Sequence, residues 1–416
     1  MSKVRFNEDT INQTTTTTVG EDQPVEKEIS IKEEYQLWRK NCHLMYGFVS
    51  ETGLTWPSLT IQWLPTSISS DSSSSGFKQR LLLGTNTSGS DTDYLKIAET
   101  VLPSGLVTED DSEDRTIQGK NARLRVTKKF KNDSEVNRAR YDPFNAKRVA
   151  TINGNGDVHL YNIDNKEEAP IVLKQHTENG YGLSWNPSIE DYLLTASDDK
   201  TVAFWDVKNT NTPVKVYDDH KDIVNEVQWH KKNQNIFGSV SDDNTFRLYD
   251  IRDHKLKSDI ARDSAINTLA FSPFSENLYA LGLANSNIEL FDMRNPSTTL
   301  HTIMGHSDAI TCLDWSPHAD SLLASGSADR RVLLWDISKI GMEQVQEDDE
   351  DGSPELFMMH AGHTAPVTDL SWNPEVKYLI GTVAEDNIVN LWKVDDGLVG
   401  EIEGWVDEED GYEGLE

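Results

Sequence analysis

GHSDAITCLDWSPHADSLLASGSADRRVLLWDI, residues 305–337, is the stretch that decides the fold. Residues 309–315 alternate apolar and polar side chains, Ser-Pro-His makes a turn, and two further extended runs follow, at residues 321–325 and 331–337. Alternation over short runs bounded by turn residues is typical of β-strands. About 40 residues hold four strands of about 5–6 residues and their turns. The stretch therefore predicts one four-stranded β-sheet.

The same pattern recurs along the chain. The aromatic residue near the end of each unit recurs at intervals of 44, 44, 42, 44 and 57 residues, at Tyr161, Trp205, Tyr249, Phe291, Trp335 and Trp392. One such sheet cannot bury both of its faces, so the sheets are expected to stack radially into a closed ring. Six units cover about residues 125–394, and residues 80–103 resemble a divergent seventh. We expect residues 54–65 to be a lone strand that pairs with the last unit and closes the ring.

The Gly-His opening and Trp-Asp ending of the unit resemble those of WD40 repeats. The resemblance implies an all-β fold, a seven-bladed WD40 β-propeller, spanning residues 54–400. It also implies a buried network in each blade, which falls on His176, Thr195, Asp199 and Trp205, on His220, Ser239, Asp243 and Tyr249, and on His306, Ser325, Asp329 and Trp335. Buried polar groups must be hydrogen-bonded, and these satisfy one another. Recurrence once per blade favours a structural role over a catalytic triad.

Ahead of the ring, apolar residues spaced by four and three positions predict an amphipathic helix over residues 29–50, docked on the side of the propeller. The stripe consists of Ile31, Tyr35, Trp38, Cys42, Met45 and Val49. Ser30 and Glu33 are placed as an N-terminal capping box. Leu37, Leu44 and Phe48 lie outside the stripe, so a second apolar edge remains after docking.

Acidic residues dominate the charge. There are 70 Asp and Glu against 39 Lys and Arg, a formal net charge of −31. Three segments without Lys or Arg hold 18 of these excess charges, with five acids in residues 109–114, five in 347–351 and eight in 401–416. We expect residues 1–28 to be a disordered tail and 401–416 an acidic tail. The charge disfavours direct nucleic-acid binding and favours a basic protein partner.

Several classes of protein are disfavoured by what the sequence lacks. It has no apolar run of about 20 residues that would span a membrane and no secretory leader. Its two cysteines, Cys42 and Cys312, are isolated, which suits a reducing compartment. There is no phosphate-binding loop and no His/Cys set with metal-ligand spacing. We therefore expect a soluble intracellular protein that is not an enzyme and holds no metal or cofactor.

The 57-residue interval contains an acidic insertion, residues 341–359. Loops longer than about 12–15 residues are uncommon in compact domains and are usually functional or disordered. Five consecutive acids run into Leu356-Phe-Met-Met. Carboxylates beside apolar residues are what a groove for a basic amphipathic helix requires.

More specific motifs resemble the histone-binding WD40 family, over about residues 29–398. They are Trp56-Pro-Ser-Leu-Thr, Gly180-Tyr-Gly-Leu-Ser-Trp-Asn-Pro, Glu350-Asp-Gly-Ser-Pro-Glu-Leu and Ser371-Trp-Asn-Pro. The family includes the retinoblastoma-binding proteins p46 and p48, the small subunit of chromatin assembly factor, and subunit 2 of the type B histone acetyltransferase. The acetyltransferase subunit is the preferred member, and the chromatin-assembly subunit is the alternative.

The resemblance implies that the first helix of histone H4 lies between the N-terminal helix and the insertion. Its apolar contacts would be Leu44, Met45, Phe48, Leu356, Phe357, Met358 and Leu398, and Glu350 and Asp351 would hold histone Arg or Lys side chains. The histone H3 tail would lie over the central channel at Glu135, Asn137, Tyr181 and Glu385. Asn179, Asn225 and Ala309 stand where related members carry Glu, which predicts weaker capture of an unmodified H3 tail. Leu300 is a candidate contact for a catalytic acetyltransferase subunit, with a plain strand start as the alternative.

The implied function is a non-catalytic histone chaperone and adaptor in the nucleus and cytoplasm. It would bind H3–H4 and present the H4 tail to a separate catalytic subunit. One alternative is a WD40 chaperone for another basic client such as a ribosomal protein, which the insertion and the helix together disfavour. A ubiquitin-ligase receptor is a more distant alternative.

Overall fold

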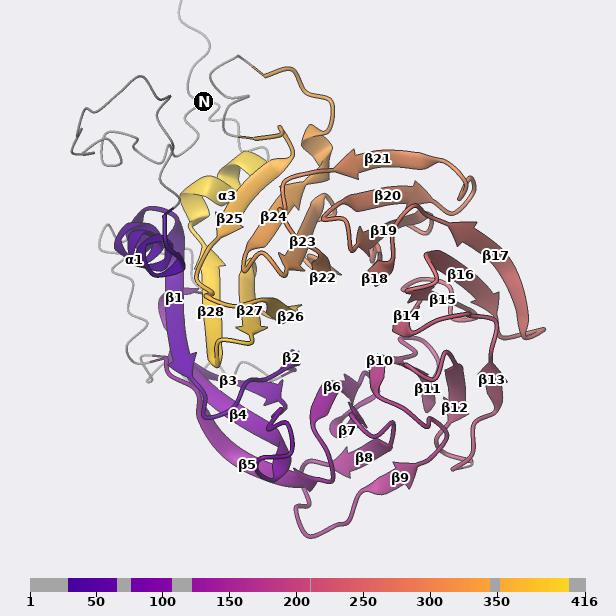
Figure 1. Cartoon of the computed structure of the whole chain (residues 1–416). Helices are drawn as coiled ribbons and strands as arrows, with labels where there is room; N and C mark the ends of the chain where they lie inside the picture. The colour runs from indigo at the N-terminus through magenta and orange to yellow at the C-terminus, as the bar shows by residue number, and fades with distance from the viewer. Residues whose placement is uncertain (1–28, 66–75, 107–121, 210, 345–351, 404–416) are drawn as a thin grey trace, which may run out of the picture.

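The computed structural model describes residues 29–65, 76–106, 122–209, 211–344 and 352–403. They form seven four-stranded antiparallel sheets, which are the blades of a closed ring around a central channel (Figure 1). The prediction of an all-β, seven-bladed WD40 propeller is confirmed. The tails expected at residues 1–28 and 401–416 lie outside the described residues, apart from the last residues of one C-terminal helix.

The helices and strands follow one another in a regular order. The N-terminal part holds α1 (Ile31–Asn41), a 3-10 turn η2 (Cys42–Leu44) and β1 (Tyr46–Gly53). Blades 1 to 3 are β2 (Ile61–Leu64), β3 (Gly76–Leu83), β4 (Asp93–Pro103), η3 (Ser104–Leu106) and β5 (Arg125–Asn132); β6 (Val136–Asp142), β7 (Asn145–Asn153), β8 (Val158–Asn162) and β9 (Ile171–Leu173); and β10 (Gly180–Trp185), β11 (Tyr192–Ser197), β12 (Val202–Asp206) and β13 (Lys215–Tyr217). Blades 4 and 5 are β14 (Val224–Trp229), β15 (Ile236–Ser241), β16 (Thr245–Asp250) and β17 (Lys255–Ala261); and β18 (Ile266–Phe271), β19 (Leu278–Leu283), β20 (Ile288–Asp292) and β21 (Thr299–Ile303). Blades 6 and 7 are β22 (Ile310–Trp315), β23 (Leu322–Ser327), β24 (Val332–Asp336), η5 (Ile337–Lys339) and β25 (Leu356–His360); and β26 (Val367–Trp372), β27 (Leu379–Ala384) and β28 (Ile388–Val394), followed by α3 (Asp396–Glu403).

The hydrophobic core lies between neighbouring blades. The two middle strands of blade 6, β23 and β24, are buried along their whole length, because both faces of the sheet are covered. One cluster joins Leu290 and Ile303 of blade 5 to Leu323 and Trp335 of blade 6. Each blade therefore completes the core of the next, and closure of the ring allows the first and last blades to bury both faces as well.

The closing strand is β1, which differs from the prediction. Tyr46–Gly53 pairs antiparallel with β28 and becomes the outer strand of blade 7. Residues 54–65, expected to close the ring, instead supply β2, the innermost strand of blade 1, which pairs with β3. Both segments are short, apolar and next to a divergent blade. Which of the two segments closes the ring is decided by which one pairs with the otherwise open backbone edge of β28.

The helix is shorter than predicted. It begins with the expected capping box, in which the Ser30 hydroxyl accepts from the Glu33 amide and the Glu33 carboxylate accepts from the Ser30 amide. It ends at Asn41, however, and residues 46–50 are a strand, so the predicted helix over residues 29–50 is wrong after η2. Apolar residues at positions 45, 46, 48 and 49 fit either structure by spacing. Pairing with β28 satisfies the backbone groups of both strands, and a continued helix would leave that edge open.

The inner strands line the channel and are held across it by ion pairs. Arg138 of β6 lies 3.2 Å from Glu226 of β14, and Arg140 of β6 lies 3.1 Å from Asp369 of β26. They surround a cavity of about 210 Å³. These pairs tie blade 2 to blades 4 and 7, and so hold the shape of the ring on which any surface site depends.

Candidate functional site

The His and Asp side chains of the repeats form buried networks inside the blades. In blade 3, Trp205 Nε1 donates to Thr195 Oγ1 (2.9 Å), the Thr195 hydroxyl donates to His176 Nε2 (2.8 Å), and His176 Nδ1 donates to Asp199 (3.0 Å). Burial by itself raises the pKa of Asp199, but the hydrogen bonds and charge of His176 and the bonds from Thr201 outweigh it and lower that pKa to about 2. These groups satisfy one another and leave no open position for a substrate.

The same arrangement recurs in three other blades. In blade 6, His306 Nδ1 lies 2.8 Å from Asp329, and both the His306 Nε2 and Trp335 Nε1 atoms bond Ser325. In blade 4, His220 contacts Asp243 and Ser239. Blade 7 holds a further copy made of His363, Thr382 and Asp386. Tyr249 occupies the aromatic position of blade 4 and is fully buried.

The helix α1 is fixed to blades 6 and 7 by polar contacts at its exposed side and by one buried aromatic. The Glu34 carboxylate lies 3.1 Å from Arg330 and 2.6 Å from Arg331, which follow β23 in blade 6. These groups are partly exposed, so the ion pairs contribute little free energy. Trp38 is buried, and we attribute most of the docking energy to it.

Trp38 begins a hydrogen-bond relay that joins three elements. Its Nε1 donates to the Tyr46 hydroxyl of β1 at 3.0 Å, and that hydroxyl donates to Nδ1 of His360 in β25 at 2.9 Å. The His360 ring stacks on Trp392 with a centroid distance of 4.5 Å. Burial, and then the charge of His363, lower the pKa of His360 well below its ordinary value, so the ring is neutral. The relay fixes α1 against the strand that ends the acidic insertion.

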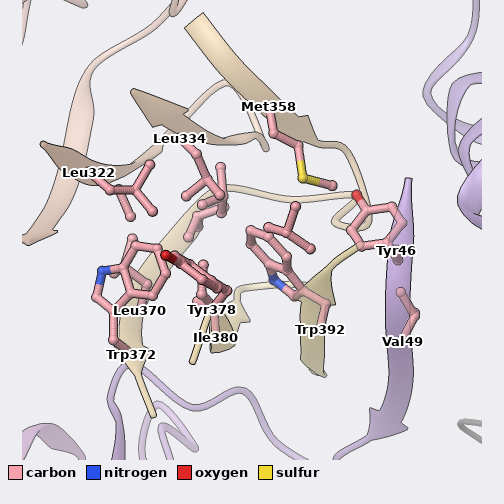
Figure 2. Close-up of a cluster of buried hydrophobic side chains, with 14 of the residues drawn as sticks. Tyr46, Val49, Leu322, Leu334, Met358, Leu370, Trp372, Tyr378, Ile380 and Trp392 are labelled. Atoms are coloured by element: carbon pink, nitrogen blue, oxygen red, sulfur yellow. The ribbon is translucent and has the colours of Figure 1, made fainter. Parts of the chain in front are cut away.

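Apolar side chains from three elements gather around this relay. Met45 follows η2, Phe357 lies in β25 and Leu398 lies in α3, and all three are partly buried against one core cluster. Leu44 is next to Met45 and is 55% exposed. Figure 2 shows part of this core cluster, with Met358 beside Tyr46 and Trp392. We call Leu44, Met45, Phe357 and Leu398 the α1–β25 surface.

Other residues expected at this surface lie elsewhere. Phe48 is only 1% exposed and belongs to the cluster between blades 7 and 1, so it cannot contact a ligand. A β-bulge at residue 47 turns it to the opposite side of β1 from Tyr46. Met358 is buried in the core, and Leu356 packs against the blade 5–6 cluster. Glu350 and Asp351 lie outside the described residues.

The residues expected to hold a peptide over the channel share one face of the ring. Glu135, Tyr181 and Glu385 lie at the start of an inner strand or at the neighbouring turn, and Tyr181 is exposed. Burial, and then the charges of Asp198 and Glu135, raise the pKa of Tyr181. Asn137 differs, because it is buried and its amide donates to the Gly180 carbonyl at 2.9 Å. Asn137 therefore joins blade 2 to blade 3 and is not an open binding group.

Two acidic residues on this face were missed by the sequence analysis. Asp198 and Asp242 stand at the same turn in blades 3 and 4 as Glu385 does in blade 7, and the amide of each donates to the residue before an inner strand. The sequence carries the signal, because each precedes the Asp of a blade network. Asn225 stands where related members carry Glu, and its amide donates to the Asp242 carboxylate at 2.7 Å. A carboxylate is therefore present beside position 225 although residue 225 itself is neutral.

Leu300 lies on the outer rim of blade 5. It falls in β21 at a break in the strand register, between residues paired with Leu290 and Phe291, and is 58% exposed. His301 beside it bonds Glu355, the buried carboxylate that precedes β25, at 3.0 Å. Leu300 is thus an exposed apolar residue near the end of the insertion.

Two general kinds of site find no support in the part of the chain that the structure describes. No group of three or more His, Cys, Asp or Glu side chains there is arranged to hold a metal ion. Neither of the α-helices there has the length and apolar character needed to cross a bilayer.

The chain matches known proteins along most of its length. Residues 33–104 match the family model of the histone-binding protein RBBP4, which also represents a component of the CAF1 complex, and residues 211–250, 297–336 and 355–393 match the WD40 repeat model. It is 51% identical to the histone acetyltransferase type B subunit 2 of Debaryomyces hansenii, over 91% of this chain and 94% of that protein. It is 51% identical to the protein of that name from Candida albicans (93% and 98% covered) and 40% identical to that from Schizosaccharomyces pombe (87% and 90% covered). The chain therefore belongs to the family of histone-binding WD40 proteins that includes subunit 2 of the type B histone acetyltransferase.

Proposed function

We propose that this protein is the non-catalytic histone-binding subunit of a type B histone acetyltransferase. It binds H3–H4 and presents the H4 tail to a separate catalytic subunit, in the nucleus and the cytoplasm. The observation that carries the proposal is the α1–β25 surface, because its partly exposed apolar side chains gather around one core cluster where a buried relay joins α1, β1 and β25.

The surface suits the first helix of histone H4. An amphipathic helix needs apolar contacts spaced along one face and carboxylates for its basic side chains. Leu44, Met45, Phe357 and Leu398 supply the apolar contacts. We assign Glu350 and Asp351 to the histone Arg or Lys side chains, where they would mainly affect orientation and association rate. Met358 supports the surface from within its core cluster, whereas Phe48 is buried in the cluster between blades 7 and 1, and neither is a contact.

A second contact is proposed for the H3 tail on the face that carries Tyr181. Glu135, Asp198, Asp242 and Glu385 line this face, which would attract a basic extended peptide. Asn137 is removed from this set because its amide is committed to Gly180. Asn179 and Ala309 remain neutral, so binding of an unmodified tail should be weaker than that of H4.

We assign no chemical step to this chain. Each His–Asp pair of the blades is buried and bonded within its own network, as His306 is to Asp329 and Ser325. Catalysis is assigned to the partner, and Leu300 is our candidate for its docking contact, since it is an isolated apolar side chain on the outer rim.

Calorimetric titration with a peptide of the H4 first helix tests the groove. Leu44→Asp combined with Asp351→Lys should weaken binding by roughly 10–100-fold, because a buried apolar anchor contributes about 1.5–3 kcal/mol and the second change reverses a charge. Phe144→Asp is the matched control, since Phe144 is 49% exposed on the distant β6–β7 turn. Equal binding by the double variant and the wild type would reject the assignment.

A second experiment separates the acetyltransferase complex from the chromatin-assembly complex. The matched family model names a component of the CAF1 complex as well as a histone-binding protein. Full-length protein should recover a catalytic acetyltransferase from extract, and Leu300→Asp should lose it while still binding the H4 peptide. Recovery of the large chromatin-assembly subunits alone would favour the alternative.

A further inference from the structure

The outer strand of blade 1 is unusual in a protein of net charge −31. β5 has eight residues, whereas β9 and β13 each have three, and it pairs only with β4, so its outer edge is open. Figure 1 shows β5 on the rim of the ring, apart from β25. Lys129 and Lys131 project from it and are exposed.

Three cations share one side of this two-strand ribbon. Lys129 lies directly opposite Lys96 of β4, and Lys131 lies opposite Tyr94. The Lys129 ammonium also lies 5.7 Å from the centre of the Tyr94 ring. Like charges directly opposite each other on neighbouring strands are destabilising. This cluster, Lys96, Lys129 and Lys131, therefore costs the folded chain free energy.

In the part of the chain that the structure describes, no carboxylate is close enough to pair with this cluster. Among the described residues, none lies within ion-pair distance of Lys96, Lys129 or Lys131, although Lys128 on the other side of β5 is 3.7 Å from Asp164. Lys96 is only 7% exposed. Burial, and then the charge of Lys129, lower the pKa of Lys96 against a smaller opposing effect of Asp93. An anion bound beside these lysines would offset the repulsion between them and favour the charged form of Lys96.

The outer strand of blade 4 carries one lysine that is paired and one, Lys255, that has no ion pair among the described residues. β17 also presents two exposed lysines, but Lys257 bonds Asp253 at 2.8 Å, and Asp259 in the same strand bonds Arg247. Lysines that merely block edge-to-edge aggregation can be neutralised in this way. Lys129 and Lys131 of β5 have no such carboxylate among the described residues.

We propose that β5 binds an extended acidic segment of a partner protein, which adds as a further strand to blade 1. The open backbone edge of β5 would supply main-chain hydrogen bonds, and side chains of the added strand would lie opposite Lys129 and Lys131. Since neighbours on one side of a strand are two residues apart, the segment needs Asp or Glu at alternate positions. This surface is separate from both proposed histone contacts.

The test measures binding of two fluorescent peptides of about ten residues to the full-length protein at low salt. In one peptide Glu alternates with Thr, and the other has the same composition with all Glu residues in one block. We expect the alternating peptide to bind at least about fivefold more tightly, because each opposite-charge cross-strand pair is favourable. Lys129→Glu with Lys131→Glu should weaken it by about tenfold or more.

The matched control is Lys255→Glu with Lys257→Glu in β17, which changes the net charge equally and should leave binding unchanged. Equal loss in both double variants would show a general charge effect and overturn the proposal. Equal binding of the two peptides would overturn it as well. If random-sequence duplex DNA bound the wild-type protein more tightly than the Lys129→Glu, Lys131→Glu variant, and neither peptide bound, β5 would be a site for a phosphate backbone and the proposal would be overturned.

Discussion

Blade 6 and the corner where α1 meets β25 both bury a histidine, and they use it differently. In blade 6, His306 donates to a carboxylate and the network is closed within one sheet. At the corner, His360 accepts from Tyr46, which in turn accepts from Trp38, and the three residues come from three separate elements. The first arrangement strengthens a repeat, and the second assembles a surface.

The difference explains which region can carry a partner. In a closed network the histidine, carboxylate and hydroxyl groups satisfy one another, as His306, Asp329 and Ser325 do in blade 6. The corner joins segments more than 300 residues apart, such as Tyr46 and His360, and leaves Leu44, Met45 and Phe357 partly exposed around the junction. A change at the corner should therefore affect binding, whereas a change in a blade network should affect stability alone.

Trp38→Ala is expected to have the largest effect. Removing a buried tryptophan costs about 3–5 kcal/mol, and here the loss should release α1 while β1 keeps the ring closed. Affinity for the H4 helix peptide should fall by at least about tenfold, as measured by calorimetry. Chemical denaturation followed by circular dichroism measures the free energy of unfolding.

The comparison inside a blade is Asp199→Ala in blade 3, which leaves His176 buried without its carboxylate. It should lower the free energy of unfolding by about 3 kcal/mol and leave the affinity for the H4 peptide unchanged below the melting temperature. A loss of affinity in this variant would show that blade interior and corner are coupled.

Tyr46→Phe tests the relay itself. The hydroxyl both accepts from Trp38 and donates to His360, so its removal leaves two buried nitrogen atoms unpaired at a cost of about 2 kcal/mol. The ring shape is retained, so any loss of H4 affinity reports on the alignment of α1 with β25. Unchanged stability and affinity would mean that packing alone sets the corner.

The network inside a blade, represented by Asp199 of blade 3, and the corner, represented by His360, should respond to acid in different pH ranges. The pKa of Asp199 is lowered to about 2, so its contribution of about 1–2 kcal/mol is complete above about pH 4 and is lost as the pH falls towards 2. The pKa of His360 is also lowered, so below about pH 6.5 the unfolded chain takes up a proton that the folded chain does not. The free energy of unfolding therefore decreases as the pH is lowered. The free energy of unfolding, measured from pH 7 to pH 2, should fall less steeply below about pH 6.5 in His360→Phe and less steeply below about pH 4 in Asp199→Asn.

The sequence predicted the parts of the protein in which local pattern and tertiary environment agree. The repeat spacing predicted seven blades, since each unit meets the same environment. The N-terminal segments around the point of ring closure were predicted less well than the repeats. Residues 46–50 were predicted to continue the helix and residues 54–65 to close the ring, because only the open edge of β28 identifies residues 46–53 as the closing strand. Phe48 was misplaced for the same reason, because its side of the strand depends on a bulge at residue 47.

The amino-acid sequence by itself determined the ring, through residue types at a repeated local spacing, and the position of the acidic insertion, through the one break in that spacing. The buried His–Asp networks and the family followed from the resemblance of its motifs to those of known proteins. Only the tertiary structure decided which side chains reach the surface. Leu44 is exposed and Phe48 is buried four residues later, although both lie outside the helical stripe. Exposure depends on which neighbour covers a face, and neighbours such as Tyr46 and His360, which are far apart in the sequence, are brought together only by the tertiary fold.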